Sequence, residues 1–343
     1  MSIGFDHLAP DILAVRFSAI GDILLTTPLL RAVRTRHPGA RIAVLTKERY
    51  VPLLIDNPNV NEVFGMDPDE ALRQVADLIR SVEYSHLLDL HGNLRTLALR
   101  RLAPGPWSSF SKARVARAAL IFAKRNLYRR TMPMAERYFE AAAGLDVEPD
   151  GSPPEFFLSA KAVERVTGRL THLGIGDGPT LVAIAPGAAH ATKRWPPLYW
   201  LELAKRLRVT GAEIVVLGGP DDMPLAEWIA SSAAPGAVSL AGMLELQETG
   251  AVIKRSAALI SGDTGVMHMA TGVGTPVVAL FGPTVREFGF FPYRSERSTV
   301  VERTLGCRPC SSQGGARCPL GHHRCMRQMA PEAVYAALCS VLA

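Results

Sequence analysis

The sequence predicts an α/β protein with two doubly wound Rossmann-like domains that face each other across a cleft. Short apolar strands alternate with helical patterns, this alternation occurs twice, and a polar Pro/Gly-rich stretch at 145–154 separates the two runs. A chain of 343 residues is long enough to build two cores. We place the first domain at residues 1–158 and the second at 159–343, with a Cys-rich tail and a terminal helix at its end.

The first half contains four apolar runs of strand length, separated by stretches with helical periodicity. Such alternation is typical of a parallel sheet covered by helices on both faces. The predicted strands are 12–17, 42–45, 60–64 and 86–90, and the predicted helices are 23–36, 71–81 and 94–101.

The second half repeats the pattern with five strands. Its last helix, 331–342, could dock on either domain. The predicted strands are 181–185, 213–217, 238–240, 257–260 and 277–281, and the other predicted helices are 160–173, 199–209, 224–231, 246–254 and 266–271.

Composition points to an ordinary globular protein, since 48% of the residues are hydrophobic and 20% are charged. No uninterrupted apolar run reaches the roughly 18 residues needed to span a bilayer. The N-terminus has no basic region followed by an apolar core of the kind found in signal peptides. We therefore expect a cytoplasmic protein.

The formal net charge of +6 is concentrated in residues 95–130, which contain no acidic residue. A solvated helix face would explain this segment, as would an anionic lipid surface or a polyanionic acceptor. Interleaved aromatic residues favour a membrane surface, and no nucleic-acid module is present, so we expect no nucleic-acid partner. The candidate acceptor or membrane contacts are Arg95, Arg114, Arg117, Lys124 and Arg125.

One corner of the second half suggests a phosphorylated ligand. Asp263, Thr264 and Gly265 lie where the strand 257–260 gives way to a helix. Free backbone N–H groups and the positive end of a helix dipole favour a diphosphate there. Ligands of open α/β sheets bind outside the carboxyl ends of the strands.

A second corner follows the first strand of the chain. Gly21 permits close approach of the backbone, and Asp22 projects from the first turn of the next helix. On spacing alone, Asp22 fits a carboxylate that satisfies free N–H groups at a helix start. The alternative is a general base that faces the cleft.

Two further loops follow strands of the second half. Lys193 comes after the strand 181–185 and could neutralise a diphosphate leaving group. After the strand 213–217, either Asp221 or Asp222 could meet a ribose, as acidic residues do in dinucleotide-binding folds. No G-x-G-x-x-G follows the first strand, which disfavours a nicotinamide dehydrogenase.

Four motifs in this order resemble glycosyltransferase family 9, the lipopolysaccharide heptosyltransferase group. They are 17–28 (FSAIGDILLTTP), 193–196 (KRWP), 217–220 (LGGP) and 262–270 with 274–284 (GDTGVMHMA and GTPVVALFGPT). The resemblance implies a GT-B fold and an inverting, metal-independent transfer from a nucleotide-diphospho-sugar. Domain 1–158 would then bind the acceptor and domain 159–343 the donor.

The resemblance also implies roles for individual residues. Asp22 maps to the proposed catalytic base, and Lys193 to the lysine that contacts the diphosphate. Where some relatives have threonines this chain has Ala188 and Ala189, so backbone N–H groups replace hydroxyls. The implied donor-binding set is Gly21, Gly187, Ala188, Lys193, Asp222, Asp263, Thr264, Gly265 and His268.

The resemblance implies transfer of a heptose from an ADP-heptose-like donor to a lipopolysaccharide core or lipid A acceptor, at the cytoplasmic surface of the inner membrane. The shared motifs serve the donor chemistry and do not identify the acceptor. Another nucleotide-sugar or glycan acceptor is therefore an alternative. A non-catalytic two-domain protein that binds sugars or nucleotides is an alternative from a different class.

Four cysteines gather near the C-terminus as C-x2-C-x7-C-x6-C, whereas the fifth, Cys339, lies apart. Clustered cysteines in a cytosolic chain favour a metal over disulfides. Four thiolates could complete a structural zinc site, with packed free thiols or disulfides as alternatives. The candidate ligands are Cys307, Cys310, Cys318 and Cys325.

Overall fold

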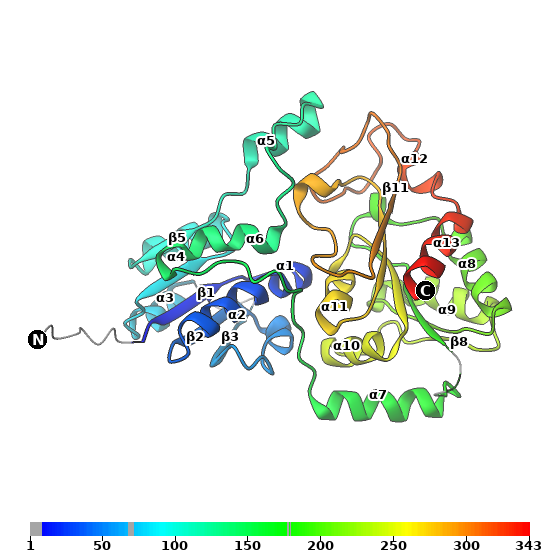
Figure 1. The fold of residues 1–343 in the computed structure, drawn as a ribbon, viewed down its shortest axis with the longest axis horizontal. Coiled ribbons are helices and arrows are strands. Elements are labelled where there is room, and N and C mark those ends of the chain that lie inside the picture. The colour runs from blue at the N-terminus through cyan, green and yellow to red at the C-terminus, as the bar shows by residue number, and fades with distance from the viewer. Residues whose placement is uncertain (1–8, 68–71, 177, 179) are drawn as a thin grey trace, which may run out of the picture. The chain divides into compact units, whose positions relative to one another are not determined.

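The computed structural model describes residues 9–67, 72–176, 178 and 180–343. Its contacts divide the chain into two compact units (Figure 1). The first comprises the described residues up to Lys112 together with Ala135–Ser152, and the second comprises Ala113–Met134 and Pro153–Ala343. The predicted first domain, 1–158, includes residues 113–134, whereas the contacts group these residues with the second unit.

The first unit is built on a parallel sheet of five strands in the order β3-β2-β1-β4-β5. Strand β1 pairs with β2 from Asp11↔Arg41 and with β4 from Ile12↔His86. The carboxyl ends of β1 and β4 are therefore neighbours at one edge of the sheet. The strands are β1 Asp11–Val15, β2 Arg41–Lys47, β3 Glu62–Met66, β4 His86–Asp89 and β5 Trp107–Ser109.

The first predicted helix is in fact two helices, α1 Ile20–Leu24 and α2 Thr27–Arg36. The hydroxyl of Thr26 donates to Ile23 O at 2.6 Å and that of Thr27 donates to Leu24 O at 2.7 Å. These hydroxyls satisfy carbonyls at the end of α1, and Pro28, which lacks an N–H, suits the first turn of α2.

The remaining helical segments of the first unit are short. Helix α3 matches the predicted helix 71–81 except at its ends, and Ala71 lies outside the described residues. The segments are η1 Glu48–Leu53, α3 Leu72–Arg80, α4 Leu94–Leu102, α6 Met134–Arg137 and η3 Tyr138–Leu145.

The second unit has a parallel sheet of six strands in the order β11-β10-β9-β6-β7-β8. Strand β6 is buried along its whole length, as expected for a central parallel strand. It pairs with β7 from Leu181↔Glu213 and with β9 from Val182↔Ala258. The strands are β6 Leu181–Ala185, β7 Glu213–Val216, β8 Ala237–Ser239, β9 Ala258–Gly262, β10 Val277–Phe281 and β11 Thr299–Glu302.

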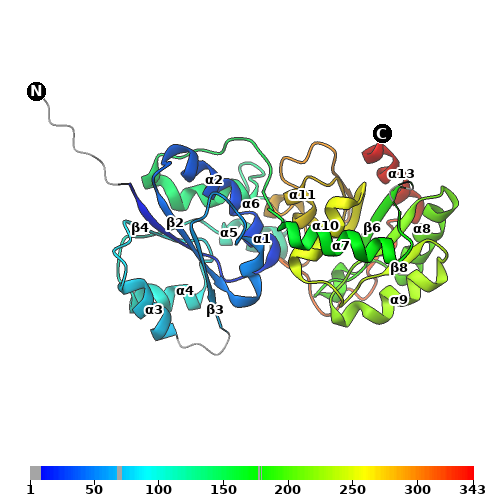
Figure 2. The ribbon, with the colours of Figure 1, turned by 90° about the horizontal axis from the view of Figure 1, so that it is seen from below.

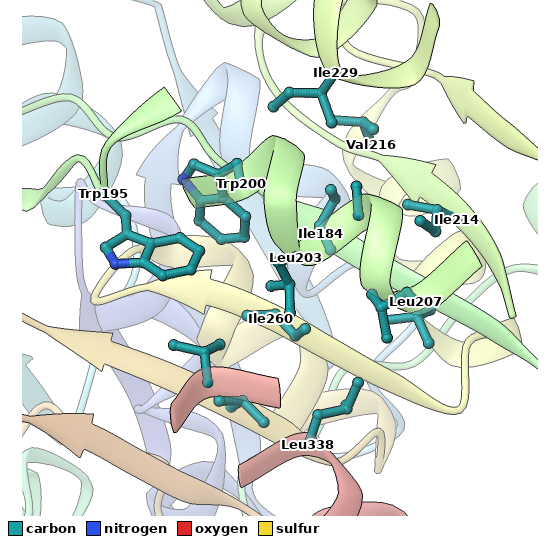
Figure 3. Close-up of a cluster of buried hydrophobic side chains, with 14 of the residues drawn as sticks. Ile184, Trp195, Trp200, Leu203, Leu207, Ile214, Val216, Ile229, Ile260 and Leu338 are labelled. Carbon is teal, nitrogen blue, oxygen red and sulfur yellow. The ribbon is translucent and has the colours of Figure 1, made fainter. Parts of the chain in front are cut away.

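Helices cover both faces of this sheet, with α8, α9 and α13 on one side and α10 and α11 on the other (Figure 2). Trp195 and Trp200 pack edge to face, with ring centres 5.0 Å apart, in the core between α8 and the sheet (Figure 3). The helical segments are α7 Ala160–His172, η4 Ala191–Lys193, α8 Pro197–Val209, η5 Pro220–Asp222, α9 Met223–Ser232, α10 Leu246–Arg255, α11 Gly265–Val273, η6 Arg286–Phe288, α12 Arg324–Arg327 and α13 Pro331–Leu342.

Residues 113–134 form an insert that belongs to the second unit. It contains α5 Arg114–Ala118 and one π-helical turn, η2 Ala119–Ala123. The guanidinium of Arg117 lies 5.5 Å from the ring centre of Phe288 in η6, and Met134 N donates to Gly289 O at 2.9 Å. Across the described part of the chain, no helix is both long and apolar enough to span a membrane.

Candidate active site

Candidate donor-binding residues follow three neighbouring strands of the second sheet. Asp263 comes directly after β9, Lys193 lies in the loop after β6, and Asp222 lies in η5 after β7. Because the order in the sheet is β9-β6-β7, these three loops share one carboxyl edge. This is the edge at which open parallel sheets bind ligands.

Lys193 and Asp263 form a partly buried ion pair at this edge. The Lys193 ammonium lies 2.7 Å from Oδ2 of Asp263 and donates to the Asp263 carbonyl at 2.8 Å. The hydroxyl of Thr284, which follows β10, donates to the same carboxylate oxygen at 2.7 Å. The side chains of Lys193 and Asp263 are 14% and 9% exposed, so the pair fixes a cation that a ligand can still reach.

Helix α11 begins beside this pair, as the sequence predicts. Thr264 is its N-cap in extended conformation, and Gly265 is the first helical residue. Thr264 Oγ1 is buried and has no hydrogen-bond partner within the described part of the chain. His268, which was predicted to bind the donor, is 3% exposed inside the helix.

Asp222 contacts Gly187, and this contact distinguishes it from Asp221, the other aspartate that could meet a ribose. The Asp222 carboxylate accepts from Gly219 N at 3.0 Å and packs against Gly187, where a Cβ would lie 2.2 Å from Oδ2. Gly187 therefore has to lack a side chain for Asp222 to adopt this position. Asp221 is exposed. The carbonyl of Ala188 accepts from Arg194 Nε at 2.9 Å.

Asp22 lies in the first turn of α1, as the sequence predicts, and buried Gly21 precedes it. Its Oδ1 lies 2.6 Å from Arg16 Nη2 and accepts from the Tyr138 hydroxyl at 3.3 Å. Within the described part of the chain, Oδ2 accepts only from Ala19 N, at 3.5 Å. Oδ1 therefore has two close partners, whereas Oδ2 has one weak contact. The Asp22 side chain is 23% exposed.

Two buried residues, Arg16 and Tyr138, contact the Asp22 carboxylate. Burial would lower the pKa of Arg16, but the nearby Asp22 carboxylate and Tyr138 raise it overall, so the guanidinium stays charged. Burial raises the pKa of Tyr138, and Asp22 adds to that effect. Tyr138 therefore remains a hydroxyl donor at neutral pH.

His91 was not predicted as a site residue. It follows β4, and because β4 pairs with β1, it lies near the strand end that carries Asp22. Burial, together with the charges of Arg16 and Lys112, lowers the pKa of His91 to about 4. Its Nδ1 is buried without a hydrogen-bond partner in the residues described. A histidine after an apolar strand was a usable signal, but only the strand order relates it to Asp22.

The basic residues singled out from the sequence are divided between the two units. Arg95 lies in α4 of the first unit, 5.6 Å from the ring centre of Phe17, whereas the other four lie in the insert of the second unit. The Lys124 ammonium donates to Cys307 O at 3.0 Å and to Pro309 O at 2.6 Å. Lys124 therefore ties the insert to the Cys-rich tail.

The four clustered cysteines are free thiols, three half-buried and one buried. Burial and then the neighbouring thiols raise the pKa of Cys310, and the same causes raise the pKa of Cys325 to about 11. Among the residues that the structure describes, no three His, Cys, Asp or Glu side chains are grouped so as to hold a metal ion. The structure therefore gives the zinc prediction no support.

Two solved glycosyltransferases superpose on this chain over nearly its whole length. The family 9 glycosyltransferase from Veillonella parvula DSM 2008 superposes with a TM-score of 0.79 at 22% identity and covers 97% of both chains. The Escherichia coli ADP-heptose lipopolysaccharide heptosyltransferase II superposes with a TM-score of 0.74 at 24% identity, covering 97% of this chain and 98% of that one. With the two parallel sheets, this likeness confirms the predicted GT-B fold class.

Comparison of the sequence with known protein families identifies the family of this chain. This chain belongs to glycosyltransferase family 9 (heptosyltransferase), whose family model matches residues 72–319. It is also 26% identical to lipopolysaccharide heptosyltransferase 2 of Salmonella typhimurium (strain LT2), over 96% of this chain and 98% of the relative. The resemblance drawn from the four motifs is confirmed, and the chain is a glycosyltransferase.

Proposed function

We propose that this chain transfers a heptose from an ADP-heptose-like donor to a lipopolysaccharide core acceptor, with inversion at the anomeric carbon. The observation that carries the proposal is the Lys193–Asp263 ion pair, 2.7 Å long, beside the start of α11. A lysine ammonium and a helix N-terminus at the carboxyl edge of a parallel sheet form a site for a diphosphate.

The relatives support the choice of donor and acceptor. The E. coli structure is that of an ADP-heptose lipopolysaccharide heptosyltransferase, and the Salmonella relative is a lipopolysaccharide heptosyltransferase. In this chain the diphosphate would lie against Lys193 and the N–H groups at Thr264–Gly265. Asp222 would meet the ribose, since it lies in η5, which follows the adjoining strand β7.

Transfer would proceed in one displacement. The acceptor hydroxyl oxygen attacks the anomeric carbon, the bond from that carbon to the diphosphate oxygen breaks, and the nucleoside diphosphate leaves with the electron pair. Attack opposite the leaving group inverts the configuration. Lys193 and the start of α11 would stabilise the charge on the departing diphosphate, so no catalytic metal is required.

Asp22 would take the proton of the acceptor hydroxyl. Arg16 and Tyr138 engage Oδ1, at 2.6 and 3.3 Å, and so fix the direction of the carboxylate. Oδ2 is the oxygen with the weaker contact, and we assign the proton to it.

The acceptor would be used at the cytoplasmic surface of the inner membrane, and the insert supports this. Val115 in α5 and Phe122 in η2, seven residues apart in two consecutive helical segments, are 78% and 84% exposed. Arg114 and Arg125 are exposed beside them, and no acidic residue lies between 95 and 130. Apolar side chains flanked by arginines suit an anionic lipid surface. We expect no nucleic-acid partner.

The test is a transfer assay with ADP-heptose and heptose-deficient core acceptor, read by mass spectrometry of the product. A mass increase of one heptose supports the proposal, and the anomeric configuration by NMR tests inversion. Transfer only from another nucleotide-sugar, or only to another glycan, would favour the alternative transferase. Donor binding without any product would favour a non-catalytic binding protein. The core oligosaccharide of a deletion strain, analysed in the same way, identifies the acceptor.

A further inference from the structure

The residue before Lys193 is held by a distant part of the chain. Thr192 is 3% exposed, and its backbone N–H donates to Gly315 O at 3.1 Å. Its hydroxyl accepts from Gly315 N at 2.8 Å, and its carbonyl lies 2.9 Å from His323 Nε2. Since a carbonyl only accepts, His323 Nε2 carries the proton of this bond. All three polar groups of Thr192 thus bond to residues 307–325, the Cys-rich segment.

At the preceding position in the segment, the backbone closely approaches the side chain of His190. Gly314 has a φ of +103°, and a Cβ there would lie 2.7 Å from the Cβ of His190. Lys193 N in turn donates to His190 O at 2.9 Å. The loop that carries Lys193 is therefore shaped by contact with the segment at both His190 and Thr192.

The same segment also reaches the other member of the ion pair. Arg308, with a side chain 6% exposed, donates to Thr284 O at 2.8 Å and pairs with Glu302 at 2.7 Å. The Thr284 hydroxyl donates to the carboxylate of Asp263. Cys310 N donates to Pro283 O at 3.2 Å. The segment is thus bonded to the loops after β6 and β10, which bear on Lys193 and Asp263 respectively.

We infer that the Cys-rich segment positions Lys193 for the donor diphosphate, with His323 and Gly315 acting on it through Thr192. This inference rests on the proposed function, because it assigns the segment a role in the same diphosphate site. Neither the His323 side chain nor the Gly315 backbone has to touch the donor. They are positioning residues. By holding Thr192 they fix the position of the Lys193 backbone, and so the region that the Lys193 ammonium can reach.

The test compares His323→Leu, which removes the donor to Thr192 O, with His323→Gln, whose amide nitrogen can take the place of Nε2. Affinity for ADP is measured by calorimetry, and the donor KM and kcat by product formation. His323→Leu should weaken ADP binding by roughly 3- to 10-fold and raise the donor KM, since one neutral hydrogen bond is lost. His323→Gln should restore most of the affinity.

His322→Leu is the matched control, because His322 neighbours His323 and its Nδ1 accepts from Arg324 N within the segment. It should bind ADP as the wild type does. Thr192→Val, which removes only the hydroxyl, is the second variant and should weaken binding in the same direction. The melting temperature of each variant is recorded, so that unfolding is recognised and Thr192→Val decides if His323→Leu does not fold.

A double-mutant cycle separates positioning of Lys193 from a general structural role. In a Lys193→Ala background, His323→Leu should have little further effect on ADP affinity, whereas a purely structural role would give additive losses. Additivity, or unchanged affinity in both His323→Leu and Thr192→Val, overturns the inference. If the wild type binds neither ADP nor another nucleoside diphosphate, the proposed function fails, and the inference fails with it.

Discussion

Lys193 and Asp263 lie 70 residues apart in sequence, yet the ammonium of the one contacts both the carboxylate, at 2.7 Å, and the carbonyl, at 2.8 Å, of the other. The lysine is therefore oriented before any ligand arrives. An incoming diphosphate would share this ammonium and would not need to order a free lysine chain, which lowers the entropic cost of binding.

The first prediction is that Lys193→Ala weakens donor binding and slows transfer. One charge-assisted hydrogen bond contributes roughly 1.5–3 kcal/mol, which corresponds to about a 10- to 150-fold loss of affinity for ADP. Lys205→Ala, which removes an exposed lysine from α8, is the control for loss of charge. Equal ADP affinities for the wild type and Lys193→Ala in calorimetry would remove Lys193 from the site.

The second prediction is that Asp22→Asn slows turnover by about 10²- to 10⁴-fold while ADP affinity stays within a factor of two or so, because a general base acts on the acceptor. The assay uses saturating donor. Asp146→Asn, at a side chain 85% exposed in the same unit, makes the same chemical change as a control. Turnover close to that of the wild type would exclude Asp22 as the base.

The third prediction concerns metals. Transfer should continue in excess EDTA, because Lys193 and the start of α11 take the place of a divalent cation at the diphosphate. The assay compares rates before and after chelation, then after addition of magnesium or manganese. A rate that collapses in EDTA and returns only with added metal would contradict the metal-independent mechanism.

The fourth prediction follows from His91, whose pKa is lowered to about 4 by burial, Arg16 and Lys112. In the unfolded chain the imidazole titrates near 6.5. Between these values the unfolded state binds a proton that the folded state does not. The stability that His91 contributes is therefore complete above pH 6.5 and is lost as pH falls toward 4.

His91→Gln cannot titrate and should not show this loss. Relative to that of His91→Gln, the melting temperature of the wild type should fall by a few degrees from pH 7 to pH 4.5. Thermal melts at half-unit pH steps measure it. Parallel curves for the two proteins across this range would show that His91 is not held neutral by its surroundings.

The fifth prediction tests the insert as a membrane contact. Phe122→Ser should reduce binding to vesicles that contain phosphatidylglycerol by about tenfold, since a buried aromatic side chain contributes on the order of 1.5–3 kcal/mol. Val209→Ser is the matched control, because Val209 is 89% exposed at the end of α8, away from the insert in sequence. The proposal would be contradicted if all three proteins bound these vesicles equally. It would also be contradicted if the wild type bound neutral phosphatidylcholine vesicles as strongly as vesicles that contain phosphatidylglycerol.

Strand and helix patterns predicted most of the fold because buried parallel strands leave a strong apolar signal. Strands β6 and β10 and helix α13 have the bounds that the sequence predicts. The sequence does not predict strands β5 and β11, which both lie at an edge of their sheet and have no buried residue. A half-buried edge strand carries little apolar periodicity, and its pairing partner is distant in sequence.

The site was predicted unevenly for a related reason. Asp22, Lys193 and Asp263 could be placed because each follows a recognisable strand. Their partners Arg16, Tyr138 and Thr284 could not, because those contacts depend on strand order and on loops that meet only in the folded chain. The bonds from Gly315 and His323 to Thr192 span more than 120 residues and leave no local pattern.

The path of the chain has a consequence for dissecting the protein. The backbone passes from the first unit to the second after Lys112, returns at Ala135 and leaves again after Ser152. No single cut therefore separates the two units intact. A fragment that ends at Ser152 would carry the insert without η6 and the Cys-rich segment, whereas a fragment from Pro153 would leave Phe288 without Arg117 and the Cys307 carbonyl without Lys124. A circular permutant or a fusion that keeps residues 113–134 with 153–343 is the arrangement that preserves the second unit.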